Sequence, residues 1–545
     1  MFVAQIPLEV PEVAWSSFAP ELPPTAAALA LLLLAIAGRH RVLTAALLGA
    51  VGLVLGAWLV VEGQTVPGAV SIALGAAAPA LALAFPGRPS LIPAWGGSLS
   101  LVGALVLTFW QYATVFAPDG GMISPGTAME GALANDGIAF FTRLTVYLVA
   151  LLVIPLGYGY LQEREINRAE VEPLILFSAV AGAVLGSAND LITMFVALEI
   201  LSLALVILTG LARRDRRSQE ASLKYFVTGA VASAILLYGM ALLYVATGSL
   251  SVPNIGRTIG LVTTPQIVPI LGLVLVTVGA GFKVALAPFH LWAPDVYQGA
   301  PTNVSAFMAA GVKAAGFAVI LRLYLVAFPS LEAMWVPALA VLAAITMLYG
   351  AYVAIVQGDV KRMLAYSSVT HAGYATIGVA ANSAAGLSAT LWYLMTYAVG
   401  TLGAFGCVVA VERVRRGEVT LTDLRGLGRT SPALAGILAL SLLSLAGIPL
   451  TAGFVGKLEV FRAGIAAGLT WLVVIGVVSS VIAAFFYLRI AGMMFLEEPG
   501  DTPNIPIVSS GLSAGVSVSA ALVLFLGIQP QLFLQLAESA AAVVR

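Results

Sequence analysis

The sequence is short of charge. Only 10% of its 545 residues are charged, 60% are hydrophobic, and the mean hydropathy is +1.01. A water-soluble protein of this length would need far more polar surface, so this composition excludes one. The net charge is zero and basic residues gather only in short clusters such as 213–217, which argues against a nucleic-acid partner. The chain is predicted to be an all-α polytopic membrane protein.

The chain also has too few cysteines and histidines for a redox centre. It contains one cysteine, Cys407, and three widely spaced histidines, His40, His290 and His371. This set excludes an intrachain disulfide and a cysteine-bound iron–sulfur cluster, and argues against haem. Neither a Walker A lysine nor a strand-associated GxGxxG motif is present. We therefore expect this chain to bind no cofactor and no metal.

Long apolar runs are what the sequence has instead. Residues 1–21 are acidic and proline-rich without the basic region of a secretory signal, so we expect a retained extramembrane segment there. A spanning helix needs about 20 apolar residues. Sixteen runs qualify: 22–37, 42–61, 67–85, 92–117, 138–161, 171–188, 190–211, 221–246, 265–288, 302–327, 335–357, 363–381, 387–411, 431–467, 470–495 and 508–528.

The loops between these runs predict an orientation. One set of alternate loops carries sixteen basic residues, whereas the other set, with both tails, carries only Arg257 and Arg545. Basic residues concentrate on the cytoplasmic side of membrane proteins. We therefore expect both termini on the outside.

Eight basic residues lie within the runs themselves. A charge at mid-bilayer costs about 2.5 to 3.5 kcal/mol, so it usually faces protein or water and marks a pathway. Near a helix end, a long side chain can instead reach the interface. We expect such anchoring for Arg143, Arg322, Arg462 and Arg489. Lys224 is only three residues into its run, and both readings stay open for it.

Two charges are too deep to reach a surface. Glu199 is the tenth residue of a 22-residue run, and Lys313 is equally central among alanines and glycines that leave room for water or a close neighbour. For both we favour a functional charge over a static ion pair.

Two further lysines lie beside helix breaks. In AGFKVALAPFHLW, Lys283 precedes Pro288, which removes a backbone donor and frees carbonyls that protein or water must satisfy. In GIPLTAGFVGK, Pro449 and two glycines interrupt a run just before Lys457. Broken helices of this kind occur at transporter ion sites, although a plain proline kink is the alternative.

Proton chemistry fits these residues. A lysine in a low-dielectric site gives up its proton more readily, and a nearby carboxylate opposes this. His371 lies in mid-span among Ser367, Ser368 and Thr370, and a histidine titrates near neutrality, which suits a relay better than a merely satisfied core residue. The features recur in two blocks, 171–327 and 335–495, which predicts inverted-topology repeats with the ion site near the membrane midplane.

These residues lie in stretches that resemble the antiporter-like subunits of respiratory complex I, and its N type in particular. The stretches are NDLITMFVALEILSL, KYFVTGAVASAILLYGMALLY, FKVALAPFHLWAPDVYQGAPT, KRMLAYSSVTHAGY and GIPLTAGFVGKLEVF, from about 190 to 461, with a weaker match from about 138 to 528. The resemblance implies an antiporter-like bundle of about 14 core helices with two inverted five-helix repeats. Three helices usually precede the first repeat; five are present here, so about two are extra. The implied division is 1–21 outside the membrane, 22–161 N-terminal helices, 171–327 and 335–495 repeats, and 508–528 a final helix.

The resemblance also implies roles. Glu199 matches the carboxylate whose partner is Lys224 or Lys283, Lys283 and Lys313 match central lysines of the proton path, His371 matches a polar position between half-channels, and Lys457 matches the terminal lysine. The M type has a glutamate where Lys457 stands, and the L type has a long lateral helix for which the roughly 17 residues after the last run leave no room.

The implied activity is proton translocation as a subunit of an NADH:quinone oxidoreductase in a bacterial inner membrane. NADH, FMN, iron–sulfur clusters and quinone would be used by other subunits, and the partners would be the M and L types, the small K, J and A types, and lipid. The alternatives are a subunit of a Mrp-type cation/proton antiporter, which WAPDVYQGAPT disfavours, and a membrane spacer whose buried charges only pair.

Overall fold

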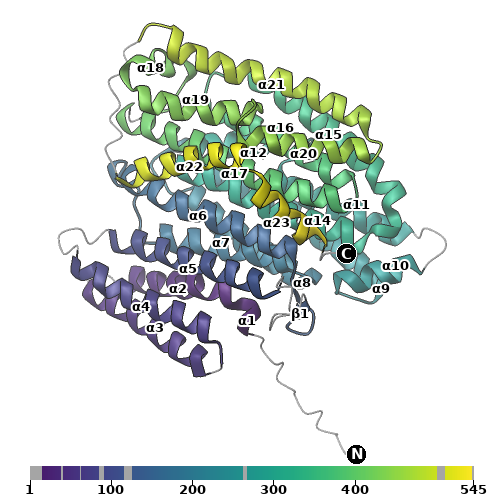
Figure 1. Ribbon diagram of the computed structural model, residues 1–545, viewed down its shortest axis with the longest axis horizontal. Helices are drawn as coiled ribbons and strands as arrows, with labels where there is room; N and C mark the ends of the chain where they lie inside the picture. Colours follow the sequence, from purple (N-terminus) through teal and green to yellow (C-terminus); the bar gives the residue numbers. More distant parts are fainter. Residues whose placement is uncertain are drawn as a thin grey trace, which may run out of the picture.

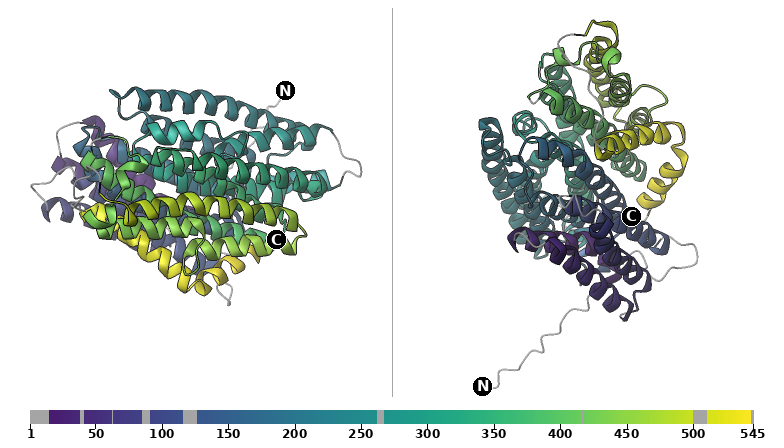
Figure 2. Two further views of the ribbon diagram at one scale, coloured as in Figure 1. Left: turned by 90° about the horizontal axis from the view of Figure 1, so that it is seen from above. Right: turned by 90° about the vertical axis from the view of Figure 1, so that its left-hand side faces the viewer.

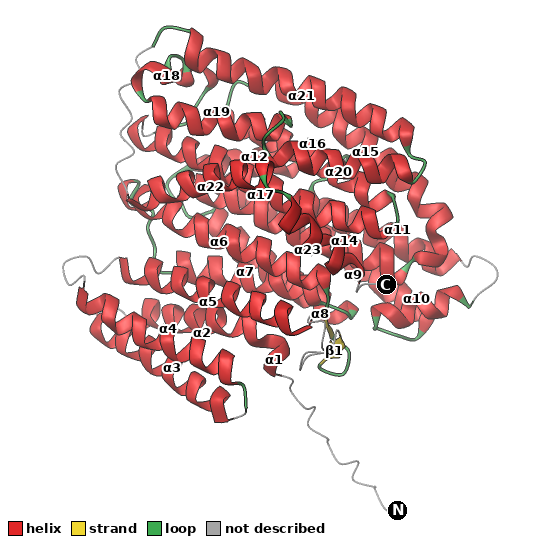
Figure 3. Cartoon of the chain, viewed as in Figure 1, coloured by secondary structure: helices red, strands yellow, loops and turns green. Residues whose placement is uncertain are grey.

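The computed structural model describes residues 15–37, 41–61, 63–84, 91–115, 126–261, 267–415, 417–499 and 510–542. Nearly all of this chain is helical (Figure 3), which confirms the all-α prediction. Helices satisfy every backbone group internally, as a bilayer requires. A short antiparallel hairpin is formed by β1 (Gly126–Ala128) and β2 (Leu133–Asn135). The long helices run side by side in one general direction (Figure 2).

The N-terminal part contains a peripheral hairpin of helices. α3 and α4 pack mainly on each other and touch the rest through α2 and α5, at the edge of the molecule (Figure 1). A Cβ on Gly52 would lie 2.6 Å from the Cα of Gly75, so glycine is what lets the two backbones approach. The elements are α1 (Trp15–Phe18), a 3-10 turn (Ala19–Glu21), α2 (Leu22–Ala37), α3 (Arg41–Val61), α4 (Thr65–Ala84), α5 (Leu91–Val115) and α6 (Gly137–Glu163).

Part of the segment expected outside the membrane, residues 1–14, lies outside the described residues. The rest, Trp15–Glu21, forms helical turns, and the 3-10 turn packs against α5.

The first block contains an interrupted helix. α11 ends at Val284 and α12 begins at Trp292, with Pro288 between them. The helix that carries Lys313 is continuous but contains a π-helical turn, Met308–Val312, immediately before the lysine. The elements are α7 (Val171–Ser187), α8 (Leu191–Thr209), α9 (Arg216–Thr247), α10 (Val252–Gly260), α11 (Ile267–Val284), α12 (Trp292–Gly299), α13 (Thr302–Phe307), α14 (Lys313–Arg322) and a second π turn (Leu323–Ala327).

The second block contains the other interruption. The 431–467 run is two helices, α19 and α20, and Pro449 lies in the gap between them. From Pro329 to the end of the described chain, the elements are a 3-10 turn (Pro329–Leu331), α15 (Glu332–Ile355), α16 (Val360–Ala380), α17 (Ala384–Arg415), a 3-10 turn (Leu421–Leu424), α18 (Leu427–Thr430), α19 (Pro432–Ala446), α20 (Ala452–Ala466), α21 (Thr470–Leu496), α22 (Ser510–Ile528) and α23 (Gln531–Ala542).

The helices differ in how deeply they are buried. Within the described ranges, ten helices are long and apolar enough to cross a membrane, and all sixteen predicted runs fall on helices. The apolar windows of α17 and of Thr302–Ala327 are entirely buried, whereas only 28% of the α9 window is buried. The core of the bundle is therefore built around α17 and α13–α14.

Many of the basic loop residues lie together at one end of this bundle. Ion pairs there join Arg413 to Glu163 and Arg415 to Asp423, so they link α17 to α6 and to the following 3-10 turn. The N-terminal ends of α9 and α16 lie at the same end, linked through Asp295. We call this the basic end.

Candidate functional site

Glu199 and Lys283 line one cavity. It has a volume of about 50 Å³ and lies between α8, α9 and α11. Lys283 Nζ donates hydrogen bonds to Ser202 Oγ at 2.7 Å and to the hydroxyl of Tyr225 at 2.9 Å. Glu199 accepts a hydrogen bond from Ser233. The walls of this cavity are mostly apolar, but it has room for water beside the polar groups of Glu199, Ser202, Ser233 and Lys283.

The helix break positions Lys283. The lysine is 5% exposed in the last turn of α11, where backbone carbonyls lose their helical donors. Trp292 Nε1 donates to the freed carbonyl of Phe282 at 3.0 Å, and the amide of Ala287 donates to Thr346 Oγ1 at 3.0 Å. The break is thus held from α12 and α15, and the lysine remains at its edge.

Lys224 lies apart from this cavity. It is 42% exposed, and its Nζ pairs with Asp295 at 2.8 Å and with Glu220 at 2.6 Å. Of the two partners considered for Glu199, only Lys283 shares a cavity with it.

Asp295 is a residue that the sequence reading missed, although it lies in WAPDVYQGAPT. Its carboxylate pairs with Lys224 of α9 and also with Arg362 of α16 at 2.5 Å, so it joins the two blocks at the basic end. Partial burial alone would raise the pKa of Asp295, but the hydrogen bonds and charges of Lys224 and Arg362 outweigh it and lower the pKa. The signal that could have identified Asp295 is a carboxylate next to two cationic side chains. Lys224 and Arg362 are both far from it in the sequence, so this signal is not visible there.

Asp295→Asn is expected to lower stability modestly, by about 1 kcal/mol or less, because the pairs are about a third exposed and screened. Because the pKa of Asp295 is lower in the folded protein, its ion pairs contribute stability at pH values above the unfolded pKa of about 3.9. This contribution is lost as the pH falls through the pKa of the folded protein. Thermal unfolding in detergent-solubilised membranes should therefore show a gap from the parent protein at pH 7 that closes below about pH 4. Glu220→Gln, at a 62% exposed position, is the matched control with a smaller effect. A gap that is constant with pH would contradict the assignment.

Lys313 occupies the centre of the bundle. It is 2% exposed at the start of α14, directly after the π turn, and its Nζ donates to the backbone carbonyl of Ser368 on α16. The same nitrogen lies 5.8 Å from the ring centre of Tyr397 on α17. Every described partner of this ammonium group is neutral, so its charge is poorly compensated.

His371 is also a neighbour of Tyr397. Their ring centres are 4.7 Å apart, and the histidine is 4% exposed. Its Nδ1 is 2.6 Å from the hydroxyl of Tyr393, and its Nε2 is 3.3 Å from that of Tyr487. Each hydroxyl can donate or accept, so both ring nitrogens can exchange a proton with a neighbour.

Lys457 binds the helix break that precedes it. It is 5% exposed on α20, and its Nζ donates to the carbonyl of Ala446, the last residue of α19, at 2.8 Å. It also donates to Ser480 Oγ on α21 at 2.9 Å. Its Nζ lies 4.9 Å from the ring centre of Tyr374, whose ring is in turn 5.6 Å from His371.

These groups form a continuous row. A Cβ on Gly316 of α14 would lie 3.4 Å from Lys283 Cγ, so the first lysine packs against the helix of Lys313. Tyr397 then connects Lys313 to His371, and Tyr374 connects His371 to Lys457. We call Glu199, Lys283, Lys313, His371 and Lys457 the buried polar axis.

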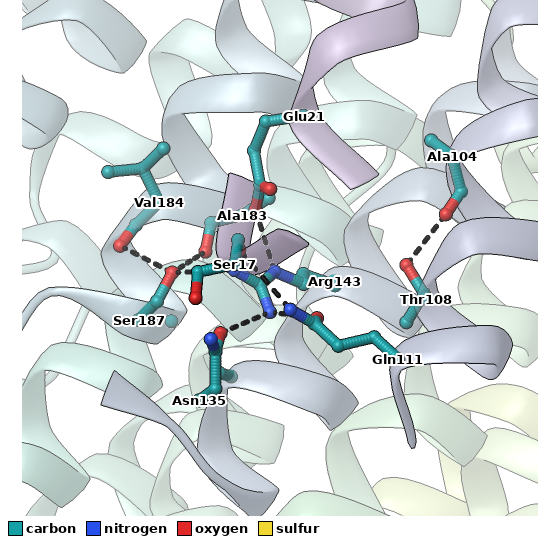
Figure 4. Close-up of polar contacts among 12 residues, drawn as sticks. Ser17, Glu21, Ala104, Thr108, Gln111, Asn135, Arg143, Ala183, Val184 and Ser187 are labelled. Atoms are coloured by element: carbon teal, nitrogen blue, oxygen red, sulfur yellow. Dashed lines mark hydrogen bonds and ion pairs between the residues drawn. The ribbon is translucent and has the colours of Figure 1, made fainter. Parts of the chain in front are cut away.

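The anchoring predicted for Arg143 and Arg322 is wrong. Both side chains are about 1 to 2% exposed. Arg143 pairs with Glu21 at 2.6 Å and donates to Gln111 and Asn135 (Figure 4). Arg322 pairs with Asp136, the N-cap of α6, at 2.8 Å. Partners from distant helices, rather than the interface, satisfy these guanidinium groups, whereas Arg462 is 69% exposed.

The described residues contain no candidate metal site. Within the described residues, no group of three or more histidine, cysteine, aspartate or glutamate side chains could hold a metal ion.

The chain is similar to proteins of one family. Residues 188–483 match the family described as NADH:quinone oxidoreductase/Mrp antiporter, TM. The chain is 47% identical over 427 residues to "NADH-quinone oxidoreductase subunit N" of Rhodococcus opacus, with 77% of each chain covered. It is 43% identical over 461 residues to the protein of the same name in Mycobacterium tuberculosis, with 82% of this chain and 85% of that one covered.

Solved structures agree with this similarity. A chain of respiratory complex I from Thermus thermophilus with bound aureothin has a TM-score of 0.69 and 36% identity, and the match covers 86% of this chain and 99% of that one. A chain of the Mrp complex from Dietzia has a TM-score of 0.72 at 23% identity, covering 92% and 97%, which shows the fold alone.

Proposed function

The chain belongs to the NADH-quinone oxidoreductase subunit N family, and we propose on this basis that its buried polar axis carries protons across the membrane while other subunits reduce quinone. It is an antiporter-like membrane subunit of a translocase complex. The observation that carries the proposal is the row itself: three lysines and a histidine, each about 2 to 5% exposed, cross the middle of the bundle. Tyr397 and Tyr374 join Lys313 and Lys457 to His371, and Lys283 packs against the helix that carries Lys313.

The chemistry follows from how poorly these charges are compensated. Lys313 and Lys457 are held by carbonyl, hydroxyl and aromatic groups, and neither ammonium pairs with an anion among the residues that the structure describes. Burial favours the neutral amine, and a charge brought nearer or taken away shifts the balance. Glu199 supplies such a charge next to Lys283. A proton moved at one lysine therefore changes the preference of the next, which is how charge movement at one end of the axis is passed along it.

The role of each residue follows from its place. Glu199 sets the charge of Lys283, Lys283 and Lys313 hold protons in turn, His371 relays them between its two tyrosine hydroxyls, and Lys457 is the last holder. Pro288 and Pro449 create the breaks that leave carbonyls for water or lysine to bind. Lys224, outside the cavity, belongs to the basic end with Asp295 and acts on the axis only through charge.

The repeats and the extra helices are also assigned here. We assign 171–327 and 335–495 as the two inverted repeats, supported by one interrupted helix in each. The α3–α4 hairpin is the additional N-terminal pair, supported by its position outside the contacts that tie α2, α5 and α6 to the first repeat.

The surroundings of the subunit complete the proposal. The basic end faces the cytoplasm of a bacterium, and both termini face outward across its inner membrane. The partners are membrane subunits of complex I, namely the M and L types and the small K, J and A types. NADH, FMN, iron–sulfur clusters and quinone are bound by other subunits, because this chain offers no redox centre of its own.

Gentle purification from the native membrane tests the assembly. We expect flavin and iron–sulfur subunits to accompany the chain, together with quinone-linked NADH oxidation. Isolation with only other multispanning subunits, and cation/proton exchange without NADH, would replace this proposal by a Mrp-type antiporter, a fold that the chain shares.

A further inference from the structure

A polar pocket opens at the basic end, away from the Glu199–Lys283 cavity. It has a volume of about 40 Å³ and lies between the C-terminal ends of α6 and α17 and the segment that leads into α13. Its outer wall includes Arg217 and Glu418, which are 58% and 43% exposed. Its inner wall includes Lys361 and Glu412, which are 8% and 2% exposed. The pocket therefore leads from the surface to a buried pair of charges.

The buried pair is poorly matched. Glu412 Oε2 accepts a hydrogen bond from Thr302 Oγ1 at 2.7 Å, but its Oε1 is 3.7 Å from Lys361 Nζ. Lys361 donates instead to the carbonyl of Ala300 at 2.8 Å. A buried ion pair must be closely hydrogen-bonded to repay its desolvation, so this pair is a weak stabilising device. The Glu412 carboxylate is therefore not held in a close ion pair.

Unpartnered polar groups continue inward from the pair. Asn303, next to Thr302 on α13, is 1% exposed, and neither its amide oxygen nor its amide nitrogen has a hydrogen-bond partner among the described residues. α6 makes space for this amide, since a Cβ on Gly157 would lie 2.3 Å from Asn303 Nδ2. A buried amide with both atoms unmatched calls for water.

The same helix leads to Lys313. Ten residues separate Asn303 from Lys313 along α13 and the π turn, about 15 Å at 1.5 Å per residue. Beside the lysine, the carbonyl of Ser368 binds Lys313, and the Ser368 side chain lies within hydrogen-bond reach of Tyr297 and Tyr397. Polar groups thus lie at both ends of the stretch between the pocket and the axis.

We propose that this pocket is the inlet through which protons from the basic end reach Lys313, with Glu412 as the carboxylate that first takes them up. A proton passes from water in the pocket to Glu412, then through water held by Asn303 and Ser368 to the neutral amine of Lys313. This inference rests on the proposed proton-translocating function.

Glu412→Gln is the direct test, made in the native complex in inside-out membrane vesicles. Glutamine keeps an oxygen to accept from Thr302 but cannot carry the proton, so we expect NADH-driven proton uptake to fall roughly tenfold or more. The solvent deuterium isotope effect on turnover should rise, because proton entry becomes rate-limiting. Glu412→Asp should retain more activity than the glutamine variant. Glu498→Gln, at an 80% exposed position, is the matched control and should pump normally.

A double variant separates the inlet from a structural ion pair. Lys361→Met with Glu412→Leu replaces the pair by apolar side chains, which is often neutral or stabilising for a buried pair. We expect this complex to assemble, to oxidise NADH slowly and to pump poorly. Normal pumping by the double variant, or by Glu412→Gln, would overturn the inlet.

A parallel Lys313→Ala variant tests the proposed proton-translocating function separately from the inlet. If it stops pumping while the Glu412 variants pump normally, the inlet is wrong and the function stands. If none of these variants affects pumping, the proposed function itself fails.

Discussion

Lys313→Ala is expected to lower NADH-driven proton translocation on the order of 100-fold, the scale on which a positioned proton-transfer group contributes. Along the buried polar axis, Lys313 is the lysine between Lys283 and Lys457. The other axis residue in that stretch is His371. Alanine leaves the carbonyl of Ser368 and the ring of Tyr397 with no proton carrier between them. Proton uptake by vesicles, measured together with NADH oxidation, reports the loss.

Two companion variants make this result specific. Lys283→Ala should show a similar loss, because it removes the neighbouring carrier beside Glu199. Arg462→Gln changes an exposed cation of α20 that pairs only locally with Glu459, and should pump normally. Complexes carrying Lys283→Ala and Lys313→Ala that assemble and pump with unaltered stoichiometry would refute the proton path.

Arg143→Leu should destabilise the protein by about 3 to 5 kcal/mol, the usual cost of removing one partner of a buried pair. Glu21 would stay 2% exposed with no cation beside it, and its Oε2 already lacks a hydrogen-bond partner within the described residues. Gln111 and Asn135 would also lose a charged donor (Figure 4). The denaturation midpoint in mixed micelles and the yield of assembled complex measure the effect.

A double variant shows whether the loss of stability in Arg143→Leu comes from leaving Glu21 without its cationic partner. Glu21→Leu combined with Arg143→Leu removes both charges, so it should recover a large part of the stability that the single variant loses. Arg462→Leu, at an exposed position, should cost little. A double variant that is as unstable as the single one would mean that Arg143 acts through packing rather than through its charge.

Burial and helix breaks could be predicted in part from the sequence, but neighbours could not. The distance of Lys313 from the ends of its apolar run correctly predicted a buried side chain, whereas Glu199 is only partly buried. The prolines near Lys283 and Lys457 correctly predicted two interruptions. Arg143 looked like an anchor because only its distance from a helix end was visible. Its partner Glu21 is 122 residues away in the chain, and no local pattern brings the two together.

The residues missed at the basic end have the same explanation. Glu412 meets Thr302 across 110 residues, and Asp295 meets Lys224 across 71. Each looked like an ordinary charge at a helix terminus, since short-range spacing reports which face a side chain occupies and not which other helix covers that face. Tertiary packing decides whether such a charge is solvated, paired or enclosed.

The hydrogen bond from Lys457 to the carbonyl of Ala446 couples the protonation of a side chain to the geometry of a helix break. A hydrogen bond from an ammonium group is about twice as strong as one from a neutral amine. If Lys457 gives up its proton, as proposed above, its hydrogen bond to the last carbonyl of α19 weakens, and the joint between α19 and α20 is held less firmly. Under that proposal, a ligand or neighbouring subunit that stiffened the joint would also set how firmly the lysine keeps its proton.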